Sequence, residues 1–252
     1  MSSFSTVKSL IPIVNMFKYD LLFQELDSWL FLGEVPALFF YELVESPYII
    51  FFINLCYKVW FFLMWGVVCF FLLTSKSSVR TAFFVSFLLC WAILGNVLAM
   101  LLSSAGPAFL SRLSPSNDTY DLLMQILETK HVWLIERDWP GLYSLATQDI
   151  LWDAYVQNKD ILGSGISAMP SLHVSMAVLL ALSITSVNRK LGSLFWVFAL
   201  VIFIGSFTLG WHYFVDGLVS APLTFVIWRI SNYVANYSSS SLQEHEKLLR
   251  SD

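Results

Sequence analysis

Positions 81–111 contain no charged side chain, and this stretch constrains the fold more than any other feature of the sequence. A helix needs about 20 predominantly apolar residues to cross the hydrocarbon core of a bilayer. Apolar segments of that length lie at about 49–74, 81–103, 168–187, 192–211 and 213–234. Only 13% of the residues are charged, against about 25% in typical soluble domains. The sequence therefore predicts an integral membrane protein, with an all-α, polytopic transmembrane helical bundle.

Basic residues gather in the connections on one side of this bundle. Lys76 and Arg80 separate the first two spans, and Arg189 and Lys190 separate the third span from the fourth. Lysine and arginine are enriched in the cytoplasmic connections of membrane proteins. We therefore expect this side to be cytoplasmic, together with a polar C-terminal tail at 235–252.

The long connection 104–167 falls on the opposite side and carries eight acidic residues against four basic ones. Its sequence predicts ordered structure, because Asn117 can cap a helix in NDTYDLLMQIL and Pro140 can open a second helix that ends near residue 156. We expect 104–167 to form a helical extracytoplasmic cap on the transmembrane bundle of residues 49–234.

Residues 1–48 are the segment with the least regular pattern. The apolar stretch WLFLGEVPALFFYEL contains Glu34 and Pro36 and is shorter than the length that a membrane span needs. An interfacial or re-entrant segment is the favoured interpretation, and a sixth span is the alternative. The expected bundle accordingly has five to six spans.

Charge and cysteine content exclude several functions. A net charge of −4 does not favour nucleic acid as a partner. The cysteines Cys56, Cys69 and Cys90 lie in apolar segments without the spacing of metal ligands, so neither a disulfide framework nor a metal site is predicted. Membrane lipids are the expected surroundings, and the sequence does not define an oligomeric state.

Two of the four histidines stand at the same predicted membrane face. His173 lies about one turn into the third span, and His212 follows Gly210, a residue type that commonly ends a helix. Asp216 comes four residues after His212 and shares its helix face. Ionisable residues in membrane helices suggest function by default. One alternative is structural, with the histidines bonded to backbone carbonyls and Asp216 capping a helix; another is a haem or metal pair.

Nucleophilic catalysis is the third interpretation of this trio. A neutral imidazole can attack phosphorus while a carboxylate on its other nitrogen fixes the tautomer and stabilises the resulting cation. A second histidine can protonate the departing oxygen and then deprotonate the incoming acceptor. One histidine paired with aspartate and one free histidine are what a phosphohistidine mechanism requires.

Three motifs carry a resemblance to a known family. GISAMPSLHVS (165–175) resembles the second signature of the type 2 phosphatidic acid phosphatase superfamily, and GWHYFVDGLVSAP (210–222) resembles its third. SSAGPAF (103–109) is similar to the first signature of the branch that contains inositol-phosphorylceramide synthases and many bacterial membrane phosphatases. The resemblance covers about 100–225.

This resemblance implies roles for four residues. His212 would be the nucleophile, Asp216 would orient it, His173 would be the general acid and base, and Ser171 would hold the phosphate. It also implies a six-helix bundle, an active site that opens at the outer membrane face, and a reaction that needs no metal or other cofactor.

The phosphate-binding cations of the superfamily have no clear counterpart here. Lys130 and Arg137 have the spacing of the usual first-signature lysine and arginine, but Asp138 replaces the proline that should follow. Ser206 stands where the superfamily has an arginine before the third signature.

Two other cations are candidates for the phosphate clamp. Arg112 follows the Gly106-Pro107 pair, and its alternative is a simple interfacial arginine. Lys58 lies about nine residues into the first span, roughly 13 Å along a helix that rises 1.5 Å per residue. It would snorkel outward, pair with an acid or face the phosphate.

The expected function is that of a membrane lipid-phosphate phosphatase that acts through a phosphohistidine at the outer membrane face. Its partner would be a lipid-linked phosphate substrate. One alternative is a lipid phosphotransferase that moves a headgroup as inositol-phosphorylceramide synthases do. Another, from a different class, is a non-catalytic lipid-binding or transport membrane protein.

Overall fold

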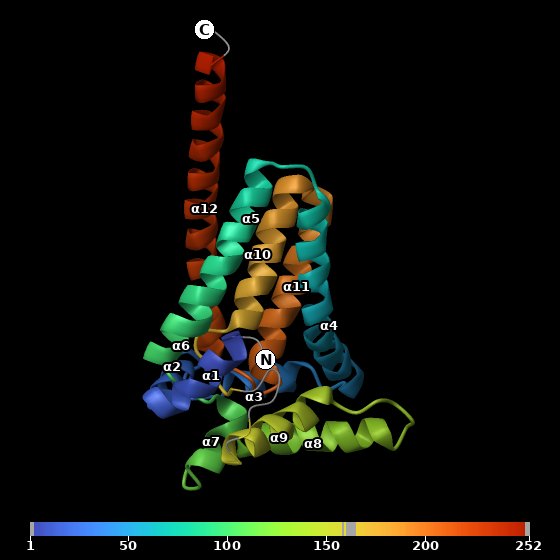
Figure 1. Cartoon of the computed structure of the whole chain (residues 1–252). Helices are drawn as coiled ribbons and strands as arrows, with labels where there is room; N and C mark the ends of the chain where they lie inside the picture. Colours follow the sequence, from blue (N-terminus) through green and yellow to red (C-terminus); the bar gives the residue numbers. More distant parts are fainter. Residues whose placement is uncertain (1–2, 158, 160–164, 250–252) are drawn as a thin grey trace.

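A computed structural model describes residues 3–157, 159 and 165–249 of the chain (Figure 1). The described residues form helices and contain no strand, which confirms the all-α fold. The bundle consists of five long apolar elements that run side by side (Figure 1). They are α4 (Pro47–Leu73), α5 (Ser78–Leu89) continued by the π-helix η1 (Cys90–Leu98) and α6 (Ala99–Leu101), α10 (Leu172–Val187), α11 (Arg189–Thr208) and α12 (Phe214–Leu249).

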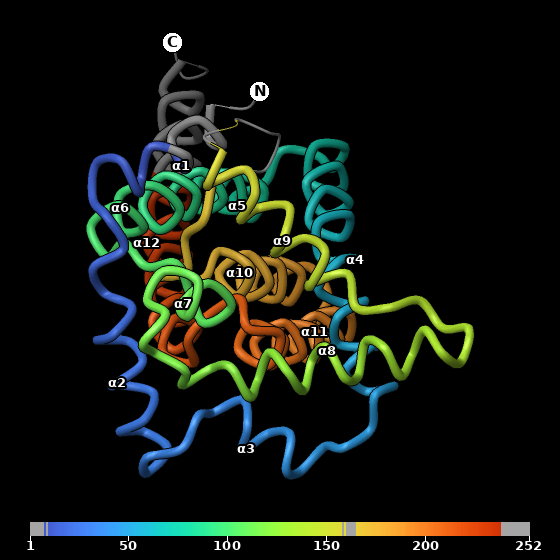
Figure 2. The backbone as a smooth tube through the Cα atoms, turned by 90° about the horizontal axis from the view of Figure 1, so that it is seen from below, coloured from blue at the N-terminus to red at the C-terminus, as the bar shows by residue number. Residues whose placement is uncertain are grey.

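Four of these elements are long and apolar enough to cross a membrane: Pro47–Leu73, Ser78–Leu101, Arg189–Thr208 and Phe214–Tyr237. The fifth, α10, is shorter and lies in the middle of the bundle (Figures 1 and 2). Every residue from Val174 to Ala181 is buried. Burial of consecutive residues means that the helix is enclosed by protein on all sides. The other spans therefore shield α10 from lipid.

Local sequence explains where the bundle helices begin. Pro47 opens α4 at a position where the missing N–H of proline costs nothing. The Ser77 side chain accepts from Arg80 N at the start of α5, and Asn188 accepts from Lys190 N and Leu191 N at the start of α11. Because Asn188 also follows the last residue of α10, α10 and α11 form a tight antiparallel hairpin.

The remaining helices gather at one end of the bundle (Figure 1). Seen from that end, α2 and α3 lie at the periphery. The helices α7, α8 and α9 pass across the end of the bundle (Figure 2). Buried hydrogen bonds connect this layer to the bundle: Ser144 N donates to Asn54 Oδ1 (3.1 Å) and Gln148 Nε2 donates to Leu209 O (2.9 Å). The bounds are α1 (Ser3–Val14), α2 (Asp20–Leu30), α3 (Pro36–Leu43), α7 (Pro107–Leu113), α8 (Asp121–Ile135) and α9 (Tyr143–Val156).

Residues 1–48 do not supply a sixth span in the described part of the chain. Their three helices have 12, 11 and 8 residues, whereas a span needs about 20. The stretch WLFLGEVPALFFYEL is divided between the end of α2 and α3, with a turn that contains Leu32 and Gly33 at positive φ. The bundle thus has five membrane-directed helices, not the six that the resemblance implied.

Two expected helix starts in 104–167 are wrong. The first helix begins at Asp121, after Tyr120, and not at a cap by Asn117. The Asn117 side chain instead donates through Nδ2 to Gln24 Oε1 in α2 (2.7 Å), while its Oδ1 accepts from Thr119 N in a local turn (3.2 Å) that ends before the helix begins. The second helix begins at Tyr143, three residues after Pro140.

Candidate active site

His173 stands in the first turn of α10, at the end of the bundle that the short helices cover. Ser171 precedes the helix, and its Oγ accepts from Val174 N (3.4 Å), which fixes the helix start. The His173 ring lies 4.3 Å from the Tyr57 ring and 4.4 Å from the Trp60 ring, centroid to centroid. Trp60 Nε1 also donates to the His173 carbonyl (3.1 Å). Aromatic side chains of α4 therefore hold the imidazole in place.

His212 lies in the short turn between α11 and α12. Gly210 adopts φ +75° just after α11, as expected of a residue that ends a helix. The chain then turns back so that His212 N donates to Ser206 O (2.9 Å), and α12 begins two residues later at Phe214. This turn brings His212 to the same end of the bundle as His173.

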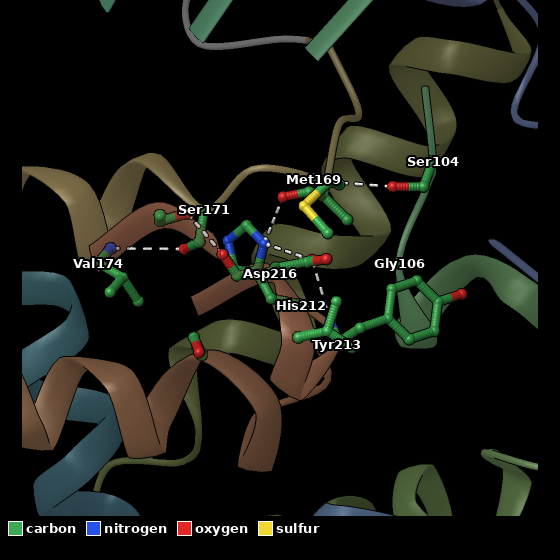
Figure 3. Close-up of polar contacts among 12 residues, drawn as sticks. Ser104, Gly106, Met169, Ser171, Val174, His212, Tyr213 and Asp216 are labelled. Carbon is green, nitrogen blue, oxygen red and sulfur yellow. Dashed lines mark hydrogen bonds and ion pairs between the residues drawn. The ribbon is translucent and has the colours of Figure 1, made fainter. Parts of the chain in front are cut away.

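The hydrogen bonds of the His212 ring define which nitrogen is free (Figure 3). Nδ1 lies 2.7 Å from Ala168 O and 3.3 Å from Asp216 Oδ2. A backbone carbonyl can only accept, so Nδ1 carries the hydrogen and Nε2 carries a lone pair. Asp216 Oδ2 also accepts from Tyr213 N (3.1 Å), which fixes the carboxylate at the start of α12.

The two imidazoles face each other across a short gap. Their ring centroids are 5.9 Å apart and the rings are inclined at 65°. An attacking atom stands about 3–3.5 Å from its target before reaction, and a general acid stands about 2.6–3.2 Å from the oxygen that it protonates. The two imidazoles are thus close enough to act on the same reacting group.

The His212 imidazole is neutral at physiological pH. Its ring is buried, with only 5% of the residue exposed. Burial lowers the pKa of His212 to about 3; the hydrogen bond to the Ala168 carbonyl opposes this shift, and the positive charge of Lys8 adds to it. The neutral form is the nucleophilic one.

The 103–109 segment packs directly against both histidine motifs. Ala168 N donates to Ser104 O (2.9 Å), and Met169 N donates to Ser104 Oγ (3.1 Å; Figure 3). Ala108 N donates to Gly210 O (2.9 Å). Three segments that are distant in sequence are thus joined by backbone hydrogen bonds around His212.

Two buried acids of α2, Asp20 and Asp27, complete the surroundings of the site, and neither belongs to a motif of the sequence. Asp20 accepts from Ala105 N (3.0 and 2.9 Å), Gly106 N (2.9 Å) and Tyr213 Oη (2.8 Å). It therefore ties the 103–109 segment to the turn that carries His212. Asp20, Phe23 and Asp27 are the buried residues of α2, and their i, i+3, i+7 spacing is the signal that could have indicated an inward face.

Asp27 caps α12 from a distant part of the chain. Its carboxylate accepts from Phe214 N (2.7 Å) and Val215 N (2.9 Å), the first two donors of that helix. Burial raises the pKa of Asp27 to about 7, the two backbone hydrogen bonds oppose the shift, and the charge of Asp216 adds to it. The helix that carries Asp216 is thus positioned by a side chain of α2.

The structure places Arg112 and Lys58 in contacts outside the histidine pair. Arg112 forms an ion pair with Asp149 (2.6 Å) and lies 5.7 Å from the Trp152 ring, both in α9. Lys58 Nζ lies 3.5 Å from the centre of the Tyr143 ring. Lys58 thus reaches from α4 to α9, in the layer of short helices at the end of the bundle, which is compatible with the expected outward direction of its side chain.

Lys130 and Arg137 are also engaged within the short-helix layer. Lys130 Nζ donates to the Glu45 carbonyl (2.5 Å). Arg137 donates to the Trp133 carbonyl (3.2 Å) and covers the Trp133 ring at 3.9 Å. Within the part of the chain that the structure describes, no group of three or more His, Cys, Asp or Glu side chains has the geometry to hold a metal ion.

Comparison with known proteins gives one match. A family model described as the PAP2 superfamily matches residues 22–230, which is well over half of the chain and includes all three motifs. Searches of curated proteins and of solved structures find no significant match.

Proposed function

The chain belongs to the PAP2 superfamily, and from this membership we propose that it is a membrane phosphatase of lipid-linked phosphates that works through a phosphohistidine on His212. The observation that carries the proposal is the His212 ring. Its Nδ1–H is held by Ala168 O at 2.7 Å and Asp216 at 3.3 Å, and its ring centroid lies 5.9 Å from that of His173. An oriented neutral imidazole beside a second imidazole is suited to in-line phosphoryl transfer.

In the first step, His212 Nε2 attacks the phosphorus atom. A P–N bond forms, the P–O bond to the lipid alcohol breaks, and His173, which is protonated at the start of the cycle, gives a proton to the departing oxygen. In the second step, His173 takes a proton from water, whose oxygen attacks the phosphorus. The P–N bond breaks, inorganic phosphate leaves, and both imidazoles return to their starting state.

Asp216 and Ser171 support these steps in the proposed mechanism. The Asp216 carboxylate, fully buried, stabilises the cation that forms on His212 when Nε2 bonds to phosphorus. Ser171 Oγ accepts from Val174 N, so its own hydrogen is available to a phosphoryl oxygen. Backbone N–H groups in the first turn of α10 add further donors, because that turn leaves them without helical partners.

We further propose that the site faces the extracytoplasmic side of the membrane. The histidine pair lies at the end of the bundle that holds α1–α3 and α7–α9 (Figure 1). Lys76, Arg80, Arg189 and Lys190 lie in or next to the turns at the opposite end. Positive connections are cytoplasmic as a rule, which supports an active site at the outer headgroup level, where a lipid phosphate would be presented.

Turnover of a panel of lipid phosphates tests this proposal. Purified protein would be offered phosphatidate, a polyprenyl pyrophosphate and a phosphoinositide, with free phosphate and lipid products both measured. We expect His212→Ala to lose at least about 10³-fold in kcat/KM, in line with the removal of other covalent nucleophiles. His131→Gln is the matched control, since His131 accepts from Leu142 N in the α8–α9 turn (2.9 Å), away from the proposed chemistry.

The products also distinguish the acceptor. Free phosphate in equal amount to the released lipid alcohol indicates water, and a new phosphorylated lipid without free phosphate indicates an alcohol acceptor. Equal turnover by the wild type and His212→Ala would overturn the mechanism, and no turnover by either protein would favour a non-catalytic role for the fold.

A further inference from the structure

The buried surroundings of the histidine pair are rich in acids. Asp20, Asp27 and Asp216 are each at most 4% exposed and lie within one network around the start of α12. Phosphoryl transfer depends on positive charge around the phosphoryl oxygens. Because the four cations expected from the sequence are held in other contacts, a substrate phosphate needs a different positive group.

The N-terminal helix α1 is fixed over this part of the molecule. Ile11 is fully buried, and Asn15 Nδ2 donates to Met100 O (2.8 Å) at the end of α6. Just after α1, Lys18 N donates to Ser103 O (3.1 Å), the first residue of the 103–109 segment. Figure 1 shows α1 beside the lower end of α5 and α6. The helix is therefore anchored to a segment that itself contacts the site.

One residue of α1, Lys8, lies against the histidine motif. A Cβ built on Gly165 would stand 2.9 Å from Lys8 Cβ and 2.9 Å from its Cγ. The lysine stem thus occupies the space that a side chain at residue 165 would fill. Gly165 comes three residues before Ala168, whose carbonyl binds His212 (2.7 Å).

The charge of Lys8 reaches both imidazoles. Its electrostatic effect extends to His173 in α10 and to His212 in the α11–α12 turn. The Lys8 side chain is half-buried, and burial lowers the pKa of its amine to about 8. The amine is thus mostly protonated at neutral pH, in a site where a counter-anion would be stabilised.

We propose that Lys8 is the phosphate-binding cation of this site, placed by α1 beside His173 and His212 to bind a phosphoryl oxygen of the lipid substrate. This role rests on the proposed phosphatase function. A lysine from a separate N-terminal helix would replace the cations that the superfamily places inside its signatures. The ligand class is a lipid-linked phosphate or, more weakly, free inorganic phosphate.

Three variants test this role through kinetics. Lys8→Met removes the charge but keeps a stem of similar length against Gly165, Lys8→Arg keeps the charge, and Lys18→Met removes an exposed lysine next to the same helix. We expect kcat/KM to fall on the order of 10²-fold for Lys8→Met, as for loss of other groups that stabilise transition-state charge. Lys8→Arg should retain most activity and extend it to higher pH than the wild type, while Lys18→Met should match the wild type.

A second measurement works without turnover, so it separates this proposal from the phosphatase proposal. Wild-type protein would be treated with an amine-acetylating reagent, with and without inorganic phosphate, and lysine modification read by mass spectrometry. Phosphate should protect Lys8 and leave Lys18 unchanged. Protection that is equal at both lysines, or absent at Lys8, would overturn the role of Lys8 even if His212→Ala is inactive. Protection of Lys8 in a protein that turns over no lipid phosphate would support the binding role and reject the phosphatase.

Discussion

Substitution of Gly106 by alanine tests how tightly the 103–109 segment positions the nucleophile. Gly106 adopts φ +99°, and its N–H donates to Asp20 Oδ1 (2.9 Å). An added Cβ would stand 2.6 Å from Trp211 O and 3.1 Å from the Ala168 Cβ. Both of these residues adjoin His212. Trp211 precedes it in the sequence, and the Ala168 carbonyl accepts a hydrogen bond from its Nδ1.

The magnitude follows from two costs. Backbone at φ +99° and ψ 166° is essentially restricted to glycine and costs another residue about 1–3 kcal/mol, and an extra methyl group in a packed region costs about 1–3 kcal/mol. Together they give about 2–6 kcal/mol of destabilisation. Since the clash is with the backbone of Trp211, it can be relieved only by moving the turn that carries His212. A shift of about 1 Å in a reacting group lowers activity on the order of 10²-fold.

The assay combines thermal unfolding in detergent with kcat/KM on the best substrate of the panel. Gly66→Ala is the matched control, because a Cβ there meets no atom within 4 Å and alanine is favoured over glycine in a helix by about 0.5–1 kcal/mol. We expect Gly106→Ala to lose both stability and activity, and Gly66→Ala to lose neither. A Gly106→Ala protein with wild-type stability and activity would refute the close packing described for this segment.

The remaining predictions concern three features of the site. Asp216→Asn should lower kcat on the order of 10²- to 10⁴-fold. We expect the lower end of that range, because Ala168 O still holds the Nδ1–H of His212 at 2.7 Å. A wild-type kcat in this variant would contradict the role of Asp216 in stabilising the His212 cation. Asp27, whose pKa is raised to about 7, contributes stability that is full below about pH 4 and is lost as the pH rises to about 7. Asp27→Asn has only one side-chain oxygen for the N–H groups of Phe214 and Val215, so it should be less stable than the wild type at about pH 4, and its unfolding temperature should change less across that range. Activity should persist in excess chelator, since the proposed steps use only side chains, and complete loss would argue for a metal enzyme.

The features that the sequence predicted well are those that depend on short spacing. His212 and Asp216 are four residues apart across the start of α12, so their contact is local. His173 lies in the first turn of α10 and His212 in the turn before α12, and two helix boundaries on the same side of a serpentine bundle lie at similar depth. The family follows from the same motifs, and the match over residues 22–230 confirms it.

The features that the sequence did not reveal depend on long-range packing. Asp20 meets Tyr213 across 193 positions, and Asp27 meets Val215 across 188. No local pattern specifies which helix end a buried carboxylate will cap. The same reason accounts for Asn117, whose side chain is taken by Gln24 of α2, and for Lys58, which covers a ring of α9. Lys8 lies outside every motif, so no local pattern indicates its contact with Gly165.

Direct trapping of the covalent adduct tests the central claim most sharply. Protein mixed briefly with a lipid phosphate that carries radioactive phosphorus would be quenched in alkali, digested and mapped. The account predicts a label that is labile in acid, stable in alkali, located on the peptide that contains His212, and missing in His212→Ala. Active protein that never carries label on that peptide, or label that persists in His212→Ala, would contradict it.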